Sequence, residues 1–215
     1  MMKDISKIGL YHIVNVDRLR SILASEYLYS DVDLADRGMS CGTSIAYEHI
    51  RERRRRIQLV DYPDLTIGSC VPFYFGKRSP MLYRATRGRT QGYDYAGGQN
   101  PIVYLVFKLD AVLKWAENSG VRWIFTDRNA SDHLAQQFNS LEQLDCLNWE
   151  VIRANFWEGN SDLKAAEFLV EHKVPVRECL LGVAARVPET KLQVEQLFKI
   201  YNIDKPVKLH PEWYF

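Results

Sequence analysis

The chain has 215 residues, of which 47% are hydrophobic and 26% charged, and a formal net charge of +1. This composition excludes a disordered protein, and the length suits one domain, which we expect to span residues 1–215. The sequence contains neither an apolar run long enough to cross a bilayer nor a signal-peptide pattern at its N-terminus. We therefore expect a cytoplasmic protein without membrane contact.

Six segments are rich in β-branched and aromatic residues, which favours β-strands. In chain order they are GLYHIV, VPFYFG, PIVYLVFKL, RWIFT, AEFLVE and LLGVAAR, at residues 9–14, 71–76, 101–109, 122–126, 166–171 and 180–186. Apolar residues at helical spacing predict helices at residues 17–28, 44–57, 110–120 and 187–202. Asp17 would cap the first of these helices, and Gly120 would end the third. Strands and helices do not alternate regularly, which favours an α+β fold over a doubly wound parallel sheet.

The cysteines give no sign of a metal site or a disulfide framework. They are far apart, with no CxxC pair, and no cysteine and histidine spacing would preorganise zinc. The four residues are Cys41, Cys70, Cys146 and Cys179. We expect them to be reduced and mostly buried. A single cysteine can act as a nucleophile beside a base, but nothing in the sequence marks such a base.

The stretch HIRERRRR places five arginines within residues 51–56 of a nearly neutral chain. On a helix with about 100° per residue and Arg51 at zero, the apolar residues Ala46, Ile50 and Ile57 cluster between roughly 220° and 260°. Arg53 and Arg54 border this stripe at roughly 200° and 300°, whereas Arg55 and Arg56 lie away from it. We expect solvent around the last two, and a carboxylate or a phosphate as the partner of the first two.

Four stretches together resemble the DarT family of NAD-dependent DNA ADP-ribosyltransferases, which are toxins of DarT–DarG toxin–antitoxin systems. They are YHIVNVDRLRSIL, SIAYEHIRERRRR, VPFYFGKRSPMLY followed by GGQNPIVYLV, and FTDRN with AAEFLV. Their order and spacing match from about Tyr11 to the terminal WYF, and the resemblance is closest to the branch that modifies thymidine. It implies a single-domain ADP-ribosyltransferase-like fold, with two facing β-sheets and helices around an NAD cleft. It also implies NAD as co-substrate, single-stranded DNA as acceptor and a DarG-type macrodomain antitoxin as partner.

The resemblance further implies which residues bind NAD. Residues 38–56 would form an NAD-binding element over the dinucleotide. The residues expected to contact NAD are Tyr11, His12, Ile13, Arg20, Leu28 and Arg54. The first three would lie at the nicotinamide end, where His12 would orient the adjacent ribose.

The catalytic residues implied by the resemblance are Glu167 and Arg54. On a strand, Glu167 and Leu169 share one side while Phe168 and Val170 share the other, so the carboxylate can point into a cleft. From the pattern alone, a glutamate in an apolar strand is more often an exposed edge residue or an ion-pair partner, and it is the resemblance that favours a catalytic role.

The acceptor-substrate loop of the family corresponds to residues 129–167. Its Trp149, Phe156 and Trp157 could stack on a base, although core packing also accounts for each of them. The residues expected to face DNA are Tyr74, Arg78, Met81, Tyr83, Arg84, Arg87 and Arg89. The last three belong to a long irregular stretch, residues 84–100, and loops of that length are usually functional or mobile. Asn129 stands where related sequences carry histidine, which would alter the acceptor contacts.

Three other functions remain open at the level of the sequence. The same chemistry could act on guanosine in DNA, on RNA or on a protein side chain. A non-catalytic nucleic-acid-binding module could be built around the arginine helix, but it would leave Glu167 and the YHI triplet unexplained. Simple hydrolysis of NAD would release free ADP-ribose and leave DNA unlabelled.

Overall fold

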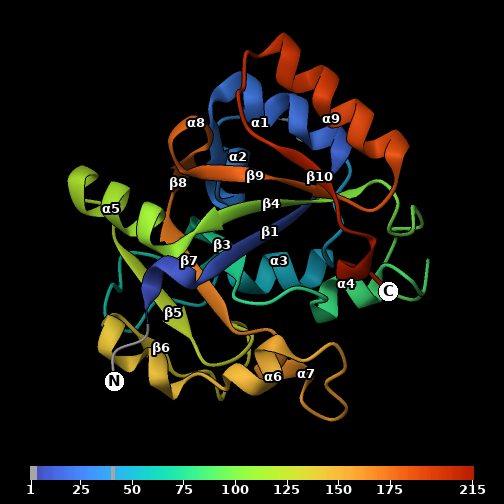
Figure 1. Cartoon of the computed structure of the whole chain (residues 1–215). Coiled ribbons are helices and arrows are strands. Elements are labelled where there is room, and N and C mark those ends of the chain that lie inside the picture. The colour runs from blue at the N-terminus through green and yellow to red at the C-terminus, as the bar shows by residue number, and fades with distance from the viewer. Residues whose placement is uncertain (1–3, 40–41) are drawn as a thin grey trace.

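The computed structural model describes residues 4–39 and 42–215 (Figure 1). The six strands predicted from the sequence are confirmed. They are β1 (Gly9–Asn15), β3 (Cys70–Tyr74), β4 (Ile102–Lys108), β5 (Trp123–Thr126), β7 (Glu167–Glu171) and β9 (Leu180–Ala185). Strands of two or three residues, too short for a periodic signal, are β2 (Tyr27–Tyr29), β6 (Gln137–Phe138), β8 (Lys173–Pro175) and β10 (Val207–Leu209).

The helices predicted at residues 110–120 and 187–202 are confirmed, and the other two are shorter than predicted. α5 (Leu109–Ser119) ends at Gly120, whose φ of +63° only glycine adopts without strain. α9 is Pro188–Ile200. The remaining helices are α1 (Leu19–Ser25), α2 (Asp31–Asp36), α3 (Glu48–Arg54), α4 (Pro80–Arg84), α6 (Trp149–Arg153), α7 (Ser161–Lys164) and α8 (Val176–Cys179).

The prediction that Asp17 caps the first helix is wrong. A short 3₁₀ turn precedes α1, and the side chain of Asn15 caps that turn. The Asp17 carboxylate instead accepts hydrogen bonds from the amide and the hydroxyl of Thr43, the latter at 2.6 Å. The carboxylate therefore ties the start of α1 to a distant segment, a contact that local spacing cannot reveal.

The eight strands of the large sheet lie in the order β10-β9-β4-β1-β3-β7-β5-β6, and β2 pairs with β8 separately. All neighbours in the large sheet are antiparallel except β9 and β10. β1 pairs with β4 along its whole length, but its register with β3 has a single pair, Tyr11 with Tyr74. The sheet thus consists of two four-stranded halves that part on either side of this pair. The α+β expectation is confirmed. The large sheet is continuous, with its two halves joined at this pair, and the separate second sheet is the β2–β8 pair.

Helices cover the first half of the sheet on both sides. In Figure 1, α1 and α9 lie above β9 and β4, while α3 and α4 lie below β1. Alternation along β1 sends Leu10 and Val14 into the main apolar core and Ile13 into a second cluster with Tyr104. None of the helices in the described part of the chain combines the length and the apolarity that crossing a bilayer requires.

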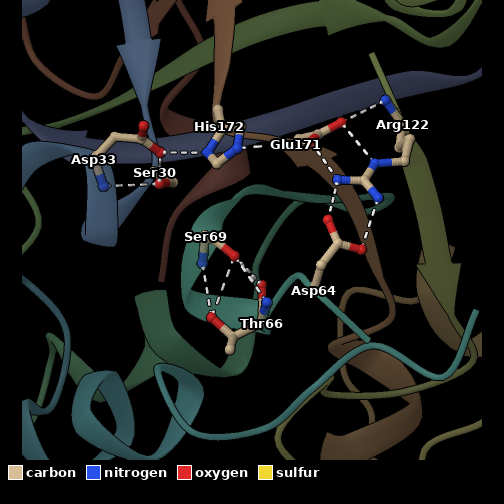
Figure 2. Close-up of polar contacts among 8 residues, drawn as sticks. All are labelled: Ser30, Asp33, Asp64, Thr66, Ser69, Arg122, Glu171 and His172. Carbon is tan, nitrogen blue, oxygen red and sulfur yellow. Dashed lines mark hydrogen bonds and ion pairs between the residues drawn. The ribbon is translucent and has the colours of Figure 1, made fainter. Parts of the chain in front are cut away.

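A chain of polar contacts fastens two surface segments to the end of β7 (Figure 2). Arg122 donates to Glu171 at 2.6 Å and forms a bidentate pair with Asp64 at 2.8 and 2.7 Å. His172 follows Glu171 in the chain, and its Nδ1 lies 3.1 Å from the carboxylate of Asp33 in α2. These contacts join the loop of residues 61–69 and α2 to the strand that carries Glu167.

Replacing Arg122 by Gln should lower the free energy of unfolding by about 1–2 kcal/mol, because the shielded Glu171 carboxylate loses its charged partner. The matched control is Lys7→Gln, which breaks the pair with Asp4, where the side chains are 82% and 52% exposed. The control should cost less than about 0.5 kcal/mol. Urea denaturation of the two variants measures both values, and equal losses would contradict the assigned difference.

Candidate active site

Three neighbouring strands form the floor of a cavity of ≈320 Å³. The register pairs Tyr11 of β1 with Tyr74 of β3, and Tyr74 with Glu167 of β7. Directly paired residues project from the same face of a sheet, so the three side chains form a row. All three line the cavity, whose volume lies in the range of small-molecule sites, roughly 300–1,000 Å³.

Arg54 of α3 reaches this floor and forms a bidentate ion pair with Glu167. Its Nη1 and Nη2 atoms lie 3.0 and 2.8 Å from Oε1 and Oε2, and the amide of Ala130 donates to Oε1 at 3.2 Å. The arginine side chain is 13% exposed and the glutamate 2%. Burial by itself would lower the pKa of Arg54, but the facing Glu167 carboxylate outweighs it and raises that pKa. The site therefore holds a permanent cation against a buried carboxylate.

The exposure of the neighbouring arginines agrees only in part with the orientations predicted from helical periodicity. Of the two that border the apolar stripe, Arg54 turns inward and Arg53 is exposed. Arg56 is exposed as predicted, but the expected exposure of Arg55 is wrong. Arg55 is half-buried, and its Cα would lie 2.9 Å from a Cβ on Gly68. The backbone of Arg55 is still helical, but the 3₁₀ turn Ile67–Ser69 packs against it, and helical periodicity cannot reveal such a long-range contact.

His12 presents a neutral imidazole to the cavity. Its Nδ1 lies 2.7 Å from the carbonyl oxygen of Pro72, which can only accept, so Nδ1 carries the proton. Burial lowers the pKa of His12 to about 4, so the ring is uncharged at neutral pH. Nε2 remains a hydrogen-bond acceptor, suited to a hydroxyl group of a ligand.

The other residues predicted to contact NAD divide between the cavity and the surface. Ile13 and Leu28 are buried and line the cavity. Arg20 is exposed on α1 and is not part of the lining. Arg18 lines the cavity instead, and its Nε is buried without a hydrogen-bond partner. Sequence reasoning missed Arg18 because the stretch DRLRS offers two arginines, and only the turn before α1 decides which of them faces inward.

The predicted NAD-binding element, residues 38–56, forms one wall of the cavity over its described part. Residues 40 and 41, including Cys41, lie outside the described residues. From the rest of the element, the lining residues are Met39, Ser44, Ile45, Ala46, Tyr47, Ile50, Arg51 and Arg54.

α2 adds a carboxylate that the sequence did not predict for the site. Asp31 lines the cavity and lies 3.2 Å from Nε of Arg51. Figure 2 shows how α2 is held: Asp33 accepts from the buried Ser30 hydroxyl and contacts the His172 ring. This trio is not a nucleophilic triad, because the imidazole contacts Asp33 and Glu171 rather than the serine.

The residues predicted to face DNA fall into two groups. Those lining the cavity are Tyr74, Met81 and Arg84. Those outside its lining are Arg78, Tyr83, Arg87 and Arg89. Arg84 donates to the hydroxyl groups of Tyr47 and Thr90, and Arg89 donates to the carbonyl of Asp94 at 3.0 Å. These two arginines therefore also order the irregular stretch of residues 84–100.

A surface rich in aromatic rings lies beside the cavity, and we call it the outer aromatic face. It consists of Arg78, Tyr83, Phe156, Trp157 and Phe215. The Arg78 guanidinium lies 5.3 Å from the Phe156 ring and 4.6 Å from the Phe215 ring. Phe215 also makes edge contacts with Tyr83 at 5.0 Å and with Trp157 at 5.3 Å. Phe156 is 78% exposed, so its ring is free to take a planar partner.

Two other residues of the 129–167 segment have structural contacts. Trp149 packs 5.6 Å from Phe75 and donates from Nε1 to the Leu144 carbonyl at 2.7 Å. Asn129 lines the cavity, and its Oδ1 accepts from the amide of Ser131 at 2.8 Å. Asn129 thus stabilises the turn that brings the Ala130 amide to Glu167.

Within the described residues, no group of histidine, cysteine and acidic side chains could hold a metal ion. Cys70 and Cys179 are buried, and burial raises the pKa of each to about 12, so both thiols stay protonated. Cys146 is exposed. A thiolate nucleophile therefore has no support among the described cysteines.

A buried carboxylate, a paired arginine and a neutral histidine share one ligand-sized cavity in this α+β fold. These features fit the class of enzymes that cleave a glycosidic bond, in which a carboxylate stabilises the cationic transition state. Comparison with known proteins narrows the class of enzyme further. A family model described as "ssDNA thymidine ADP-ribosyltransferase, DarT" matches residues 11–215.

Relatives and solved structures agree with this match. The DNA ADP-ribosyl transferase of Thermus sp. strain 2.9 is 36% identical over 211 residues, covering 96% of this chain and 95% of the relative. The structure of Thermus sp. 2.9 DarT in complex with ADP-ribosylated ssDNA superimposes with a TM-score of 0.86 at 32% identity, covering 97% and 96% of the two chains. Its complex with NAD+ gives 0.81 at 27% identity over 100% of both. The chain belongs to the DarT family, and is a DNA ADP-ribosyltransferase with NAD as co-substrate.

The buried imidazole predicts a specific pH dependence of stability. The pKa of His12 falls from its ordinary 6.5 to about 4 on folding, so the unfolded chain takes up this proton first. The free energy of unfolding should therefore fall as the pH drops from 6.5 towards 4, by up to about 3 kcal/mol from this group. The variant His12→Asn lacks the titration and should lose less. Urea denaturation at several pH values measures this loss. If His12 were not buried in its neutral form, the free energy of unfolding would change equally with pH in the wild type and in His12→Asn.

Proposed function

We propose that this chain transfers the ADP-ribosyl group of NAD to thymidine bases of single-stranded DNA, with Glu167 and Arg54 as the catalytic pair. The observation that carries the proposal is the bidentate contact of these two residues on the floor of the cavity. Family membership supports the choice of thymidine as acceptor. The proposal extends to a toxin role in the cytoplasm, opposed by a DarG-type macrodomain.

The reaction breaks the bond between nicotinamide and ribose C1, and nicotinamide leaves with the electron pair. C1 then bonds to N3 of thymine, and the N3 proton passes to solvent. Positive charge develops on the ribose before the new bond forms, so catalysis depends on negative charge placed beside C1. Glu167 is the buried carboxylate that supplies it.

The hydrogen bonds of Glu167 leave it one position for substrate. A carboxylate offers about four acceptor positions. Oε1 uses two, for Arg54 and the Ala130 amide, and Oε2 uses one, for Arg54. The remaining position on Oε2 can accept a hydrogen bond from the ribose 2′-hydroxyl. This contact strengthens as the sugar becomes cationic, which is the condition for lowering the barrier.

Arg54 has N–H groups left for the substrates. The guanidinium carries five, and two point to Glu167. The other three can bind a phosphate of NAD or an oxygen of the incoming thymine. Arginine is too weak an acid to serve as a general base, so its part in removing the N3 proton is to stabilise the negative charge that forms on the base.

Two further side chains of the cavity fit the dinucleotide. The Nε2 acceptor of His12 suits a ribose hydroxyl next to the nicotinamide. Arg18 brings a guanidinium with an unpartnered buried Nε, which a diphosphate oxygen would satisfy. NAD binding would thus remove an energetic cost that the free protein carries.

The outer aromatic face suits the acceptor strand. An exposed Phe156 under an arginine offers stacking to any base, as single-strand binders do. Arg87, which donates to the Tyr83 hydroxyl at 2.6 Å, adds charge beside it. With a net charge of only +1, attraction for DNA must come from such local groups rather than from the whole surface.

Replacing Glu167 by Gln should lower the rate of DNA modification by about a hundredfold to a thousandfold, because the negative charge beside C1 is lost. The control Glu117→Gln alters an exposed glutamate of α5 outside the cavity lining and should keep the wild-type rate. The assay incubates protein, NAD and oligonucleotides with or without thymine, and measures the mass of the products.

A gain of one ADP-ribose confined to thymine-containing strands is expected. Labelling of guanine, of RNA or of no strand would overturn the thymidine assignment, and full activity of Glu167→Gln would overturn the role of the carboxylate. The same proteins test the toxin role, since growth arrest in cells should follow expression of the wild type but not of Glu167→Gln. Co-expression of a DarG macrodomain should relieve the arrest, and arrest by both proteins would contradict the toxin proposal.

Replacing Phe156 by Ala should weaken binding of a single-stranded oligonucleotide by about 1–3 kcal/mol, the worth of one stacked base. The control is Ile200→Ala on α9, where the side chain is 65% exposed and remote from the cavity lining. Fluorescence anisotropy measures the affinity. Rising salt should weaken the wild type and Phe156→Ala in parallel, because the arginine contacts remain. Unchanged affinity in Phe156→Ala would remove the outer aromatic face from the acceptor path.

A further inference from the structure

Lys164 is a buried ammonium group that the proposed mechanism does not use. The residue lies at the end of α7, three positions before Glu167, and is 2% exposed. Its Nζ donates to the carbonyl oxygens of Ile152 and Ala154 at 2.6 and 2.7 Å. Lysine is rarely buried without a carboxylate partner, and among the described residues these two carbonyls are its hydrogen-bond acceptors. Burying an ammonium group costs free energy because the group loses its hydration, so this arrangement needs a structural or functional explanation.

Ile152 lies in the last turn of α6 and Ala154 is its C-cap, and an ammonium there offsets the partial negative charge of a helix end. The carbonyl of Ile152 also packs against the turn that follows β3, where a Cβ on Gly76 would lie only 2.3 Å away. Lys164 therefore holds α6 against the strand pair that carries Tyr74 and Glu167. Figure 1 shows α6 and α7 next to each other at the edge of the molecule.

The chain leaves α6 directly into the outer aromatic face. Phe156 and Trp157 follow the Ala154 carbonyl, and the Lys164 ammonium lies 5.7 Å from the Trp157 ring. Trp157 in turn contacts Phe215 and Tyr83. The lysine thus fixes one end of the short segment that displays the exposed Phe156, while the ring contacts fix the other.

We propose that Lys164 is a positioning residue for the acceptor strand, which fastens residues 152–157 so that the outer aromatic face meets DNA beside Glu167. This inference rests on the proposed function. Lys164 does not itself touch either substrate. Its loss should weaken productive binding of DNA much more than binding of NAD, whose cavity is lined by other residues.

The protonation state of Lys164 changes within the range of pH in which the protein can be assayed. Burial, and next the nearby positive charge of Arg78, lower the pKa of Lys164 to about 8. The group loses its proton as the pH rises through that value, and the two hydrogen bonds to Ile152 and Ala154 lose their charge assistance. Fastening of the segment should therefore be nearly complete at pH 7 and clearly weaker at pH 9.

Steady-state kinetics of DNA modification at pH 7 tests the proposal with three variants. Lys164→Met removes both donors at similar volume, Lys164→Arg keeps a cation, and Lys114→Met alters an exposed lysine of α5. For Lys164→Met we expect a KM for the oligonucleotide about tenfold higher, with the KM for NAD changed less than about twofold. Lys164→Arg should fall between this variant and the wild type, and Lys114→Met should match the wild type.

A second measurement is a pH titration of the wild-type protein, whose main result does not depend on the folding of a variant. The KM for the oligonucleotide should rise about threefold to tenfold between pH 7 and pH 9, since the helix end and the two carbonyls lose a charged partner. The same titration of Lys164→Arg should be flat, because arginine stays charged. A flat wild-type profile, or the same rise in Lys164→Arg, would overturn the proposal.

The outcomes separate this inference from the proposed function. If the wild type labels thymine-containing strands and Lys164→Met has the wild-type KM for the oligonucleotide, the positioning role fails and the function stands. If Lys164→Met raises both KM values equally, Lys164 has only a general structural role and the proposal fails. If the wild type labels no strand, the proposed function fails and this inference falls with it.

Discussion

The buried ion pair of Arg54 and Glu167 constrains the rest of the structure. A carboxylate that is 2% exposed would be strongly unfavourable without its arginine, and either partner alone would leave an uncompensated charge. The arginine comes from a helix 113 residues earlier in the chain. α3 must therefore lie against β7, and this contact fixes the segment over the cavity. The pair that we propose as catalytic also holds the two walls of the cavity together.

The cavity exists because the large sheet parts between β1 and β3. The carbonyl of Pro72 points towards β1, where it accepts a hydrogen bond from the His12 side chain rather than from a backbone amide. Pro72 also has no N–H with which to donate a backbone hydrogen bond from β3 to β1. Backbone pairing of β3 with β1 is therefore limited to Tyr11 and Tyr74. The strands diverge beyond that pair. One residue thus both opens the cavity and sets the tautomer of the histidine inside it.

Different elements build the two sides of the site. The side on which we propose that NAD binds is built from α2, α3 and the start of α1, which are tied together by carboxylates such as Asp31 and Asp17. The side on which we propose that DNA binds is built from aromatic rings and from two carbonyls that accept hydrogen bonds from Lys164. Glu167 lies where the two sides meet. Such an arrangement allows the acceptor side to be altered without changing the dinucleotide side.

Local sequence determined the parts of this protein that depend on neighbouring residues. Alternation over β7 placed Glu167 on one face, and periodicity found α5 and α9. Periodicity left both Arg53 and Arg54 at the edge of the apolar stripe, and the family resemblance then implied His12 and Arg54. Periodicity defines a face within an element but not what packs against it. Tertiary structure therefore decided which arginine turned inward, why Arg18 rather than Arg20 lines the cavity, and what holds Lys164. The contacts responsible join residues far apart in the chain, so their energies depend on the fold and leave no periodic trace in the sequence.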